Sequence, residues 1–279
     1  MVSRTPALLA AVTGEIIGTF LLVFFGCGAV ATSVLTGAQS GVFQVAIVWG
    51  LGIATAIYLT ASLSGAHLNP AVTVSLAVWG GFPKGRILPY FAAQMAGAMF
   101  ASGVLFIIYR DALAACEAAH SITRGGPGSE ATAMIFGEYF PSPGGKPLTE
   151  AARAMMSPWS AFFAEVIGTA VLLLVICGVT DERNAARPGV LAPATVGLTV
   201  TLLISLLGPL TMACFNPARD LGPRIFSALA GWGSVPFTAN GMGWLTVYII
   251  APVLGGLLGA GLYHRMLRPL YAAASSGTA

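Results

Sequence analysis

The chain has 279 residues, of which 56% are hydrophobic and only 8% are Asp, Glu, Lys or Arg. A soluble domain carries about 25% charged residues, so this composition excludes nearly every soluble enzyme, and its hydrophobicity excludes a disordered chain. The formal net charge of +3 is small and no basic run is present, which argues against nucleic acid as a partner. A lipid bilayer is the solvent that suits such a chain.

Six apolar segments are long enough to cross a bilayer as helices, which takes about 20 residues. In chain order they are 8–35, 42–63, 87–109, 159–179, 190–207 and 244–266. They are continuously apolar and do not alternate as barrel strands do, so we expect an all-α membrane protein. The first segment is too long for a cleaved leader, and we expect it to remain in the mature protein. Two further apolar segments, 69–79 and 216–229, are too short to cross.

The sequence contains an internal duplication. Glu15-Ile-Ile-Gly-Thr in the first span returns 150 residues later as Glu165-Val-Ile-Gly-Thr in the fourth, and Asn69-Pro-Ala returns 147 residues later as Asn216-Pro-Ala. Each copy holds three spans and one short helix, and since three is odd, the second copy must be inverted in the membrane. We expect the repeats at 1–112 and 157–267, a long outer connecting segment at 113–156 and a tail at 268–279.

The charges of the loops predict the orientation. An even number of spans places both termini on one side, where basic residues outnumber the acids Asp181 and Glu182. These basic residues are Arg4, Lys84, Arg86, Arg183, Arg187, Arg265 and Arg268. The positive-inside rule then predicts cytoplasmic termini, and the cell's inner (plasma) membrane is the default location. The connecting segment on the opposite side is rich in Gly, Pro and Ser, and we expect irregular structure there.

The two Asn-Pro-Ala triplets, Asn69-Pro70-Ala71 and Asn216-Pro217-Ala218, predict two half-helices with defined starts. Asn is a good N-cap, and Pro at the first helical position sacrifices no hydrogen bond. The side-chain NH2 group of each Asn would remain free to donate, and inverted half-helices that meet start to start would place both NH2 groups side by side at the middle of the membrane. Each helix start also contributes about half a positive elementary charge, so the meeting point would repel cations and must line a polar cavity.

The segments that lead into the triplets cannot continue the preceding helix, so their carbonyl groups would face the same cavity as hydrogen-bond acceptors. These residues are Gly65, Ala66, His67 and Leu68 in the first copy and Met212, Ala213, Cys214 and Phe215 in the second. Central donors flanked by acceptors would suit a neutral, hydroxylated molecule. One such triplet would be only a helix start, but two at the repeat spacing indicate a pore.

The segments Ser64-Gly-Ala-His-Leu-Asn-Pro-Ala-Val-Thr73 and Asn216-Pro-Ala-Arg-Asp-Leu-Gly-Pro223 resemble the two signature loops of the major intrinsic protein (aquaporin) family. Asp220 directly after Arg219, and Arg224 four residues later, resemble its aquaglyceroporin branch, which includes the glycerol uptake facilitators. A solvated surface charge is the alternative for Arg224. The resemblance also implies a homotetramer in which each subunit has its own pore.

By position, the resemblance implies an outer constriction formed by Trp49, Ile204, Ala213 and Arg219. Water-selective members carry His where Ile204 lies, and a typical bacterial glycerol facilitator carries Gly there and Phe at the position of Ala213. The constriction of this chain is therefore apolar apart from Arg219. It would tolerate carbon chains, with the preference among polyols, urea, small undissociated acids and metalloid solutes left open.

The resemblance also implies supporting residues. Glu15 and Glu165 would accept hydrogen bonds from the two loops, Gln94 would hold loop backbone, and Asp220 would also support a loop. The alternative for Asp220 is a carboxylate that is merely stabilised in the first turn of the second half-helix. A proton relay is the rival role for the two glutamates. For Cys214 the alternatives are block by mercurials and inaccessible packing.

These expectations describe a passive channel for glycerol with some water, which excludes ions and protons. The alternatives are a water-selective or a broad neutral-solute channel, and an ion-coupled transporter. No catalytic set is evident, and we expect no metal and no cofactor. The expected partners are small neutral solutes and the lipid bilayer.

Overall fold

The computed structural model describes residues 7–275. Six of its helical segments are long and apolar enough to cross a membrane. The first five are α1 (Leu8–Thr36), α2 (Val42–Ser64), α4 (Ile87–Ile108), α8 (Pro158–Thr180) and α9 (Ala192–Thr211). The sixth runs through α12 (Gly243–Leu245), η4 (Thr246–Ile250), α13 (Ala251–Leu262), η5 (Tyr263–Leu267) and α14 (Arg268–Ser275). The six predicted spans agree with these helices to within a few residues, and the predicted tail begins as a continuation of the last helix.

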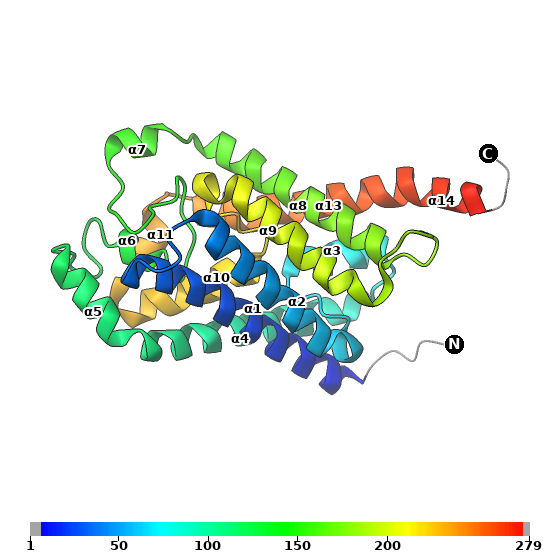
Figure 1. Ribbon diagram of the computed structural model, residues 1–279, viewed down its shortest axis with the longest axis horizontal. Coiled ribbons are helices and arrows are strands. Elements are labelled where there is room, and N and C mark those ends of the chain that lie inside the picture. The colour runs from blue at the N-terminus through cyan, green and yellow to red at the C-terminus, as the bar shows by residue number, and fades with distance from the viewer. Residues whose placement is uncertain (1–6, 276–279) are drawn as a thin grey trace.

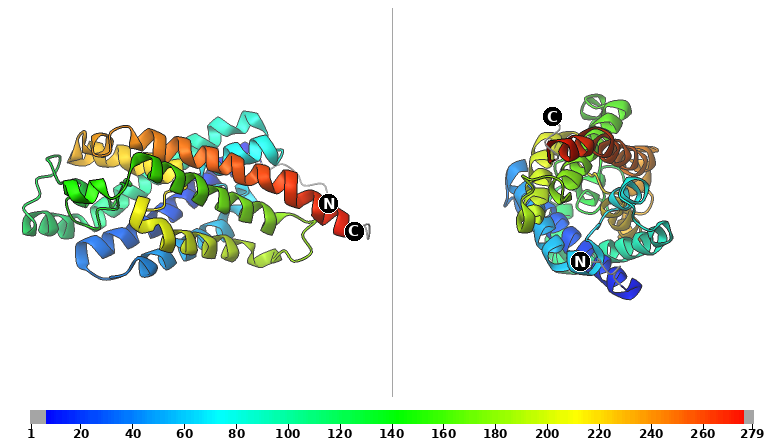
Figure 2. Two further views of the ribbon diagram at one scale, coloured as in Figure 1. Left: turned by 90° about the horizontal axis from the view of Figure 1, so that it is seen from above. Right: turned by 90° about the vertical axis from the view of Figure 1, so that its right-hand side faces the viewer.

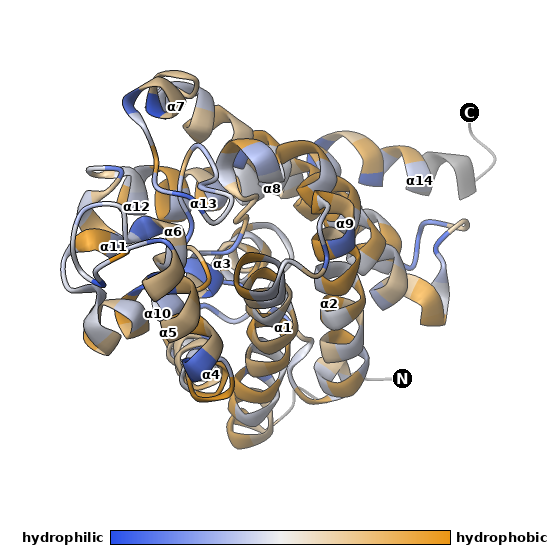
Figure 3. Cartoon of the chain, turned by 60° about the vertical axis from the view of Figure 1, so that its left-hand side comes forward, coloured by the Kyte–Doolittle hydropathy of each residue, from blue (hydrophilic) through white to orange (hydrophobic). Residues whose placement is uncertain are grey.

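The long helices lie along the long axis of the molecule, and both described ends of the chain lie at the same end of the bundle (Figure 1). Figure 2 shows the same arrangement from two further sides. Hydrophilic residues gather mainly in the connecting segments, whereas the long helices are largely hydrophobic (Figure 3). Large apolar side chains such as Leu51, Phe100 and Leu206 are exposed on the outside of the bundle, as expected for a surface in contact with lipid.

The two half-helices are α3 (Pro70–Trp79) and α10 (Pro217–Ser227). Each packs against the third long helix of the other repeat: α3 against α13, and α10 against α4. Within each repeat the first helix packs against the second and third, which pairs α1 with α2 and α4, and α8 with α9 and α13. The half-helices therefore join the two repeats into one bundle.

The helices of the two repeats approach each other at equivalent places. Gly97 of α4 lies against the carbonyl of Ile16 in α1, and Gly255 of α13 lies against the carbonyl of Val166 in α8. Ile16 and Val166 are the second residues of the duplicated motif. Small residues let helix backbones approach closely in lipid, and a Cβ atom at either glycine would overlap the carbonyl oxygen.

The connecting segment is more ordered than its composition predicts. It contains three short helices, α5 (Arg110–Ala119), α6 (Glu130–Ala133) and α7 (Glu150–Ala154), and the irregular structure that we expected lies between them, at 120–129 and 134–149. Residues 129–140 are all buried, because the apolar run after Glu130 folds back into the bundle. α11 (Val235–Thr238) lies at the same end of the molecule (Figure 1).

At the end of the bundle near the termini, Asp181 joins two elements. Its Oδ2 accepts a hydrogen bond from the hydroxyl of Tyr263 at 2.8 Å and pairs with Nε of Arg268 at 3.2 Å. The basic residues of the predicted cytoplasmic side lie in the loops and helix ends here, except Arg4, which lies outside the described residues. Two positions of the sixth helix are thereby tied to the end of α8.

Candidate functional site

Both loops that precede the half-helices depart from helical geometry in the same way. In the first loop φ is positive at Gly65, Ala66 and Leu68, and in the second loop at the positions 147 residues later, which are Met212, Ala213 and Phe215. Residues other than glycine adopt a positive φ angle at an energetic cost, so contacts with the surrounding protein must hold the loop backbone in this conformation. The repeated pattern makes the two loops structural copies of each other.

A buried carboxylate holds the first loop. Glu15 in α1 accepts hydrogen bonds from the backbone N–H groups of His67 at 2.9 Å and Leu68 at 2.7 Å. The side chain of Gln94 in α4 donates to the same carboxylate at 2.7 Å. The ring of His67 lies 3.1 Å from the hydroxyl of Thr73 in α3, which connects the loop to its half-helix.

An equivalent carboxylate holds the second loop. Glu165 in α8 accepts hydrogen bonds from the N–H groups of Cys214 at 3.0 Å and Phe215 at 2.8 Å, and from the hydroxyl of Thr211 at 2.6 Å. Both glutamates are fully buried. The loop N–H groups, which no regular helix satisfies, thus find acceptors within the membrane-spanning bundle.

Two asparagines join the half-helices at their starts. The side-chain oxygen of Asn69 accepts from the N–H of Ala71 at 2.8 Å, and that of Asn216 accepts from the N–H of Ala218 at 3.0 Å. The side-chain amide of Asn69 donates to the carbonyl of Phe215, and that of Asn216 donates to the carbonyl of Leu68, each at 2.8 Å. Each asparagine therefore caps its own half-helix and donates a hydrogen bond to the loop of the other repeat.

This exchange modifies the sequence expectation. One N–H of each asparagine amide is used within the protein, which leaves one for a molecule in the cavity. The carbonyls of Leu68 and Phe215 each accept one of these bonds and so have only one lone pair left for a solute.

An inner cavity of about 520 Å³ runs past the asparagine pair toward the end of α8 and the start of α9. Most of its wall is apolar, with Leu22, Ile53, Leu172 and Val196 among the side chains. The predicted site residues that line it are Trp49, Gly65, Ala66, His67, Leu68, Asn69, Ile204, Ala213, Cys214, Phe215, Asn216 and Arg219. The remaining ones do not: Pro70, Ala71, Pro217 and Ala218 begin the half-helices, Asp220 lies in the first turn of α10, Glu15, Gln94 and Glu165 lie behind the loops, and Met212 lies outside this cavity.

A second cavity of about 440 Å³ lies on the side away from the termini. It is bounded by the start of α2, the end of α9 and the connecting segment, and it includes Met212, His120 and Lys146. Among residues 7–275, only Trp49, Ile204 and Arg219 line both cavities. The cavities therefore meet at three of the four residues predicted for the constriction, while Ala213 lines the inner cavity alone.

The guanidinium of Arg219 is held on several sides. It lies 4.4 Å from the centre of the Trp49 ring, and its Nη1 donates to the carbonyl of Phe136 at 3.3 Å and to Sγ of Cys27 at 3.5 Å. Trp49 in turn fits against Gly26 in α1, where a Cβ atom would overlap the ring. In the described part of the chain, Nη2 of Arg219 has no hydrogen-bond partner.

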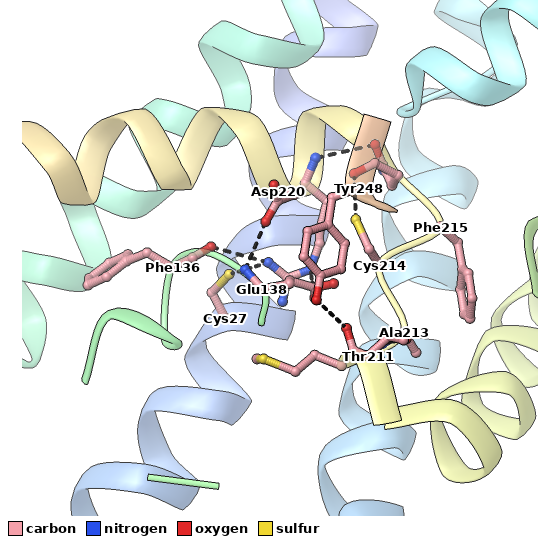
Figure 4. Close-up of polar contacts among 12 residues, drawn as sticks. Cys27, Phe136, Glu138, Thr211, Ala213, Cys214, Phe215, Asp220 and Tyr248 are labelled. Atoms are coloured by element: carbon pink, nitrogen blue, oxygen red, sulfur yellow. Dashed lines mark hydrogen bonds and ion pairs between the residues drawn. The ribbon is translucent and has the colours of Figure 1, made fainter. Parts of the chain in front are cut away.

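Glu138, which is not among the site residues expected from the sequence, lies in the buried part of the connecting segment. Its Oε1 is 2.7 Å from Nε of Arg219, and the two side chains are 1% and 3% exposed. Figure 4 shows Glu138 together with Cys27, Phe136 and Cys214. Burial raises the pKa of the Glu138 carboxyl, and the Arg219 guanidinium opposes that rise. A single acid within the apolar run 131–140 was the available signal in the sequence.

Asp220 and Arg224 hold the backbone of Glu138 from both sides. The N–H of Glu138 donates to Asp220 at 2.8 Å, and its carbonyl accepts from Arg224. Nε and Nη2 of Arg224 also contact the Asp220 carboxylate at 2.8 and 2.7 Å. Arg224 is 2% exposed, so the alternative of a solvated surface charge is wrong. Asp220 supports the connecting segment rather than the loop before the second half-helix.

Cys214 lies at the wall of the inner cavity and is 5% exposed. Its thiol donates to the carbonyl of Asn216 at 3.2 Å. All four cysteines are free and buried.

Comparisons with known proteins agree with this architecture. A family model described as major intrinsic protein matches residues 2–263. A glycerol uptake facilitator protein of Pseudomonas aeruginosa is 42% identical over 94% of this chain and 90% of its own length. A propanediol uptake facilitator of Citrobacter freundii is 38% identical over 94% and 93%. The X-ray structure of the aquaglyceroporin from Plasmodium falciparum matches with a TM-score of 0.80 at 28% identity, over 95% of this chain and 99% of that one.

Proposed function

Because the chain belongs to the major intrinsic protein family, we propose that it is a passive channel that conducts glycerol across a membrane. The chain is a multi-pass membrane protein and not an enzyme. The observation that carries the proposal is the pair of cavities that meet at Trp49, Ile204 and Arg219. A solute passing from one to the other would contact apolar side chains and a few fixed hydrogen-bonding groups.

The groups along this path suit a small polyol. Arg219 and the amides of Asn69 and Asn216 can donate to hydroxyl oxygens, and the free carbonyls of the loops can accept from hydroxyl hydrogens. Trp49, Ile204 and the apolar wall of the inner cavity can contact the carbon atoms. We assign the constriction to Trp49, Ile204, Ala213 and Arg219. The relatives named for glycerol and for propanediol uptake support the same class of solute.

The starts of α3 and α10 meet at the asparagine pair, and each contributes about half a positive elementary charge. This arrangement opposes cations and protons in the middle of the path, whereas neutral solutes and water can pass.

The assembly and orientation belong to the same proposal. Homotetramer formation in the lipid bilayer is implied by the family resemblance. The basic residues at the end that holds the termini favour a cytoplasmic location for that end, in the cell's inner (plasma) membrane.

Stopped-flow measurements on liposomes that contain the purified protein test this function. We expect glycerol influx much faster than in empty vesicles, with a rate that is linear in the concentration difference and no ion conductance. A panel of water, glycerol, propanediol and urea in the same preparation would rank the solutes. Glycerol influx no faster than in empty vesicles would overturn the channel, and uptake that depends on a proton gradient would indicate an ion-coupled transporter.

A further inference from the structure

The charge of Arg219 is matched within the protein by the buried carboxylate of Glu138. The 2.7 Å between Nε and Oε1 is within the range of charge-assisted hydrogen bonds between nitrogen and oxygen. Neither Glu138 oxygen accepts a well-aligned hydrogen bond from residues 7–275. The guanidinium charge is therefore the principal compensation for this carboxylate, since attraction between charges depends on distance more than on angle.

The neighbouring carboxylates have other partners. Both oxygens of Asp220 contact Arg224, which forms a separate ion pair. The oxygens of Glu165 accept hydrogen bonds from the second loop. Glu138 is thus the carboxylate that faces Arg219, and its backbone is fixed by Asp220 and Arg224.

We propose that Glu138 neutralises Arg219, so that the outer constriction excludes cations without a net positive charge. The inference rests on the proposed channel function. Cation exclusion then depends on the positive ends of α3 and α10 at the asparagine pair. Arg219 acts at the constriction as a hydrogen-bond donor to neutral solutes, through the Nη2 group that lacks a protein partner. Glu138 is a positioning residue, since it lines neither cavity and acts through Arg219.

The alternative is that Arg219 repels cations through its own unbalanced charge. The two accounts differ in what happens when the charges are removed singly or together. Removing Arg219 alone leaves a buried, unpaired carboxylate beside the path, which attracts cations. Removing both charges restores neutrality, and it should restore cation exclusion only if Arg219 is already balanced in the native channel.

The experiment compares R219Q, E138Q and the double variant E138Q/R219Q in liposomes, with potassium leak and glycerol influx measured on each preparation. We expect R219Q to leak potassium roughly tenfold faster than the native protein, because one unit of charge beside the path changes the barrier substantially. E138Q and the double variant should leak no faster than the native protein. Equal leak in R219Q and the double variant would overturn the proposal: if both leak, the charge of Arg219 is the barrier, and if neither leaks even at alkaline pH, where a Glu138 carboxyl without its guanidinium partner would ionise, Glu138 contributes no charge. Faster leak in E138Q would overturn it as well.

A control variant and an alternative pair of variants complete the comparison of potassium leak. E130Q is the matched control, since Glu130 is a buried acid in the same segment that pairs with Arg153 at 2.9 Å, away from the constriction. E130Q should leave potassium leak unchanged. If E130Q leaked as fast as R219Q, loosening of the connecting segment would explain the leak, and the proposal would be overturned.

If the Gln variants do not insert into the membrane, the Met variants R219M and E138M/R219M provide the same comparison, because buried ion pairs are often replaceable by apolar residues. Glycerol influx of the native protein separately reports whether the channel function itself holds.

Discussion

Where the two cavities meet, three side chains of different chemistry share the wall. Trp49 supplies a flat apolar surface that also contacts the Arg219 guanidinium, and Ile204 supplies a branched aliphatic one. Arg219 supplies the hydrogen-bond donors. A polyol needs both kinds of surface, because its carbon atoms and its hydroxyl groups must leave water together. Water needs only the donors and acceptors.

Replacing Ile204 with His tests this division. The imidazole removes an apolar contact for carbon and adds a polar group that binds water, so we expect the ratio of glycerol to water permeability to fall about tenfold. Stopped-flow measurement of both permeabilities on one preparation gives the ratio. The volume-conserving variant Ile204→Leu should leave it nearly unchanged. A similar ratio in all three proteins would show that the constriction lies elsewhere.

The sequence located Arg219 because it follows the second triplet directly, and located Trp49 and Ile204 only through the family resemblance. The sequence does not specify what holds them, although Glu138 stands out as a single acid within an apolar run. Gly26 makes room for the Trp49 ring, and Glu138 pairs with Arg219. Both residues contact the constriction from segments remote in sequence, and no local pattern encodes such a contact.

Among the elements, the half-helices and their loops could largely be predicted from the sequence. Asn and Pro define the start of each half-helix through local capping chemistry, which operates whatever surrounds it. The loops themselves depend on tertiary contacts. Their positive φ angles are held by Glu15 and Glu165, which donate nothing and accept from the loop N–H groups of each copy.

The variant Glu165→Gln tests this dependence. A Gln amide has one acceptor oxygen, and its NH2 group would face a loop N–H that also needs an acceptor. A buried N–H left unsatisfied costs about 1–3 kcal/mol, so the loop should shift and glycerol permeability per molecule should fall roughly tenfold.

Glycerol influx normalised to the amount of inserted protein measures the effect. Glu182→Gln is the control, because that side chain is 91% exposed and its replacement should leave influx unchanged. Native influx in Glu165→Gln would show that the loop needs neither the carboxylate charge nor the second acceptor oxygen.

In the whole molecule, two inverted repeats enclose the path, and the half-helix of each packs on the third long helix of the other. The close approaches of α1 to α4 and of α8 to α13 support this arrangement. In lipid, where helices gain little from burying apolar surface against each other, close van der Waals contact is a main source of stability.

Gly97→Ala tests the first of these approaches. The added Cβ would overlap the carbonyl of Ile16 in α1, and overpacking of this kind costs about 1–3 kcal/mol. We expect a lower midpoint of thermal unfolding in detergent. Gly103→Ala on the same helix is the matched control, because its Cβ would lie 3.6 Å from the ring of Phe226 in ordinary contact. Equal midpoints for the two variants would contradict a packing role for Gly97.

The sequence by itself determined the six spans, their inverted duplication and the starts of the two half-helices, because hydrophobic length, repeat spacing and helix capping follow from the order of residues along the chain. Through the family resemblance it also indicated that Glu15 and Glu165 accept hydrogen bonds from the two loops. Only the tertiary structure decided that the connecting segment folds back into the bundle and brings Glu138 to Arg219. The physical reason is that burial of a charge depends on a partner distant in sequence, and only the packed bundle brings the two together.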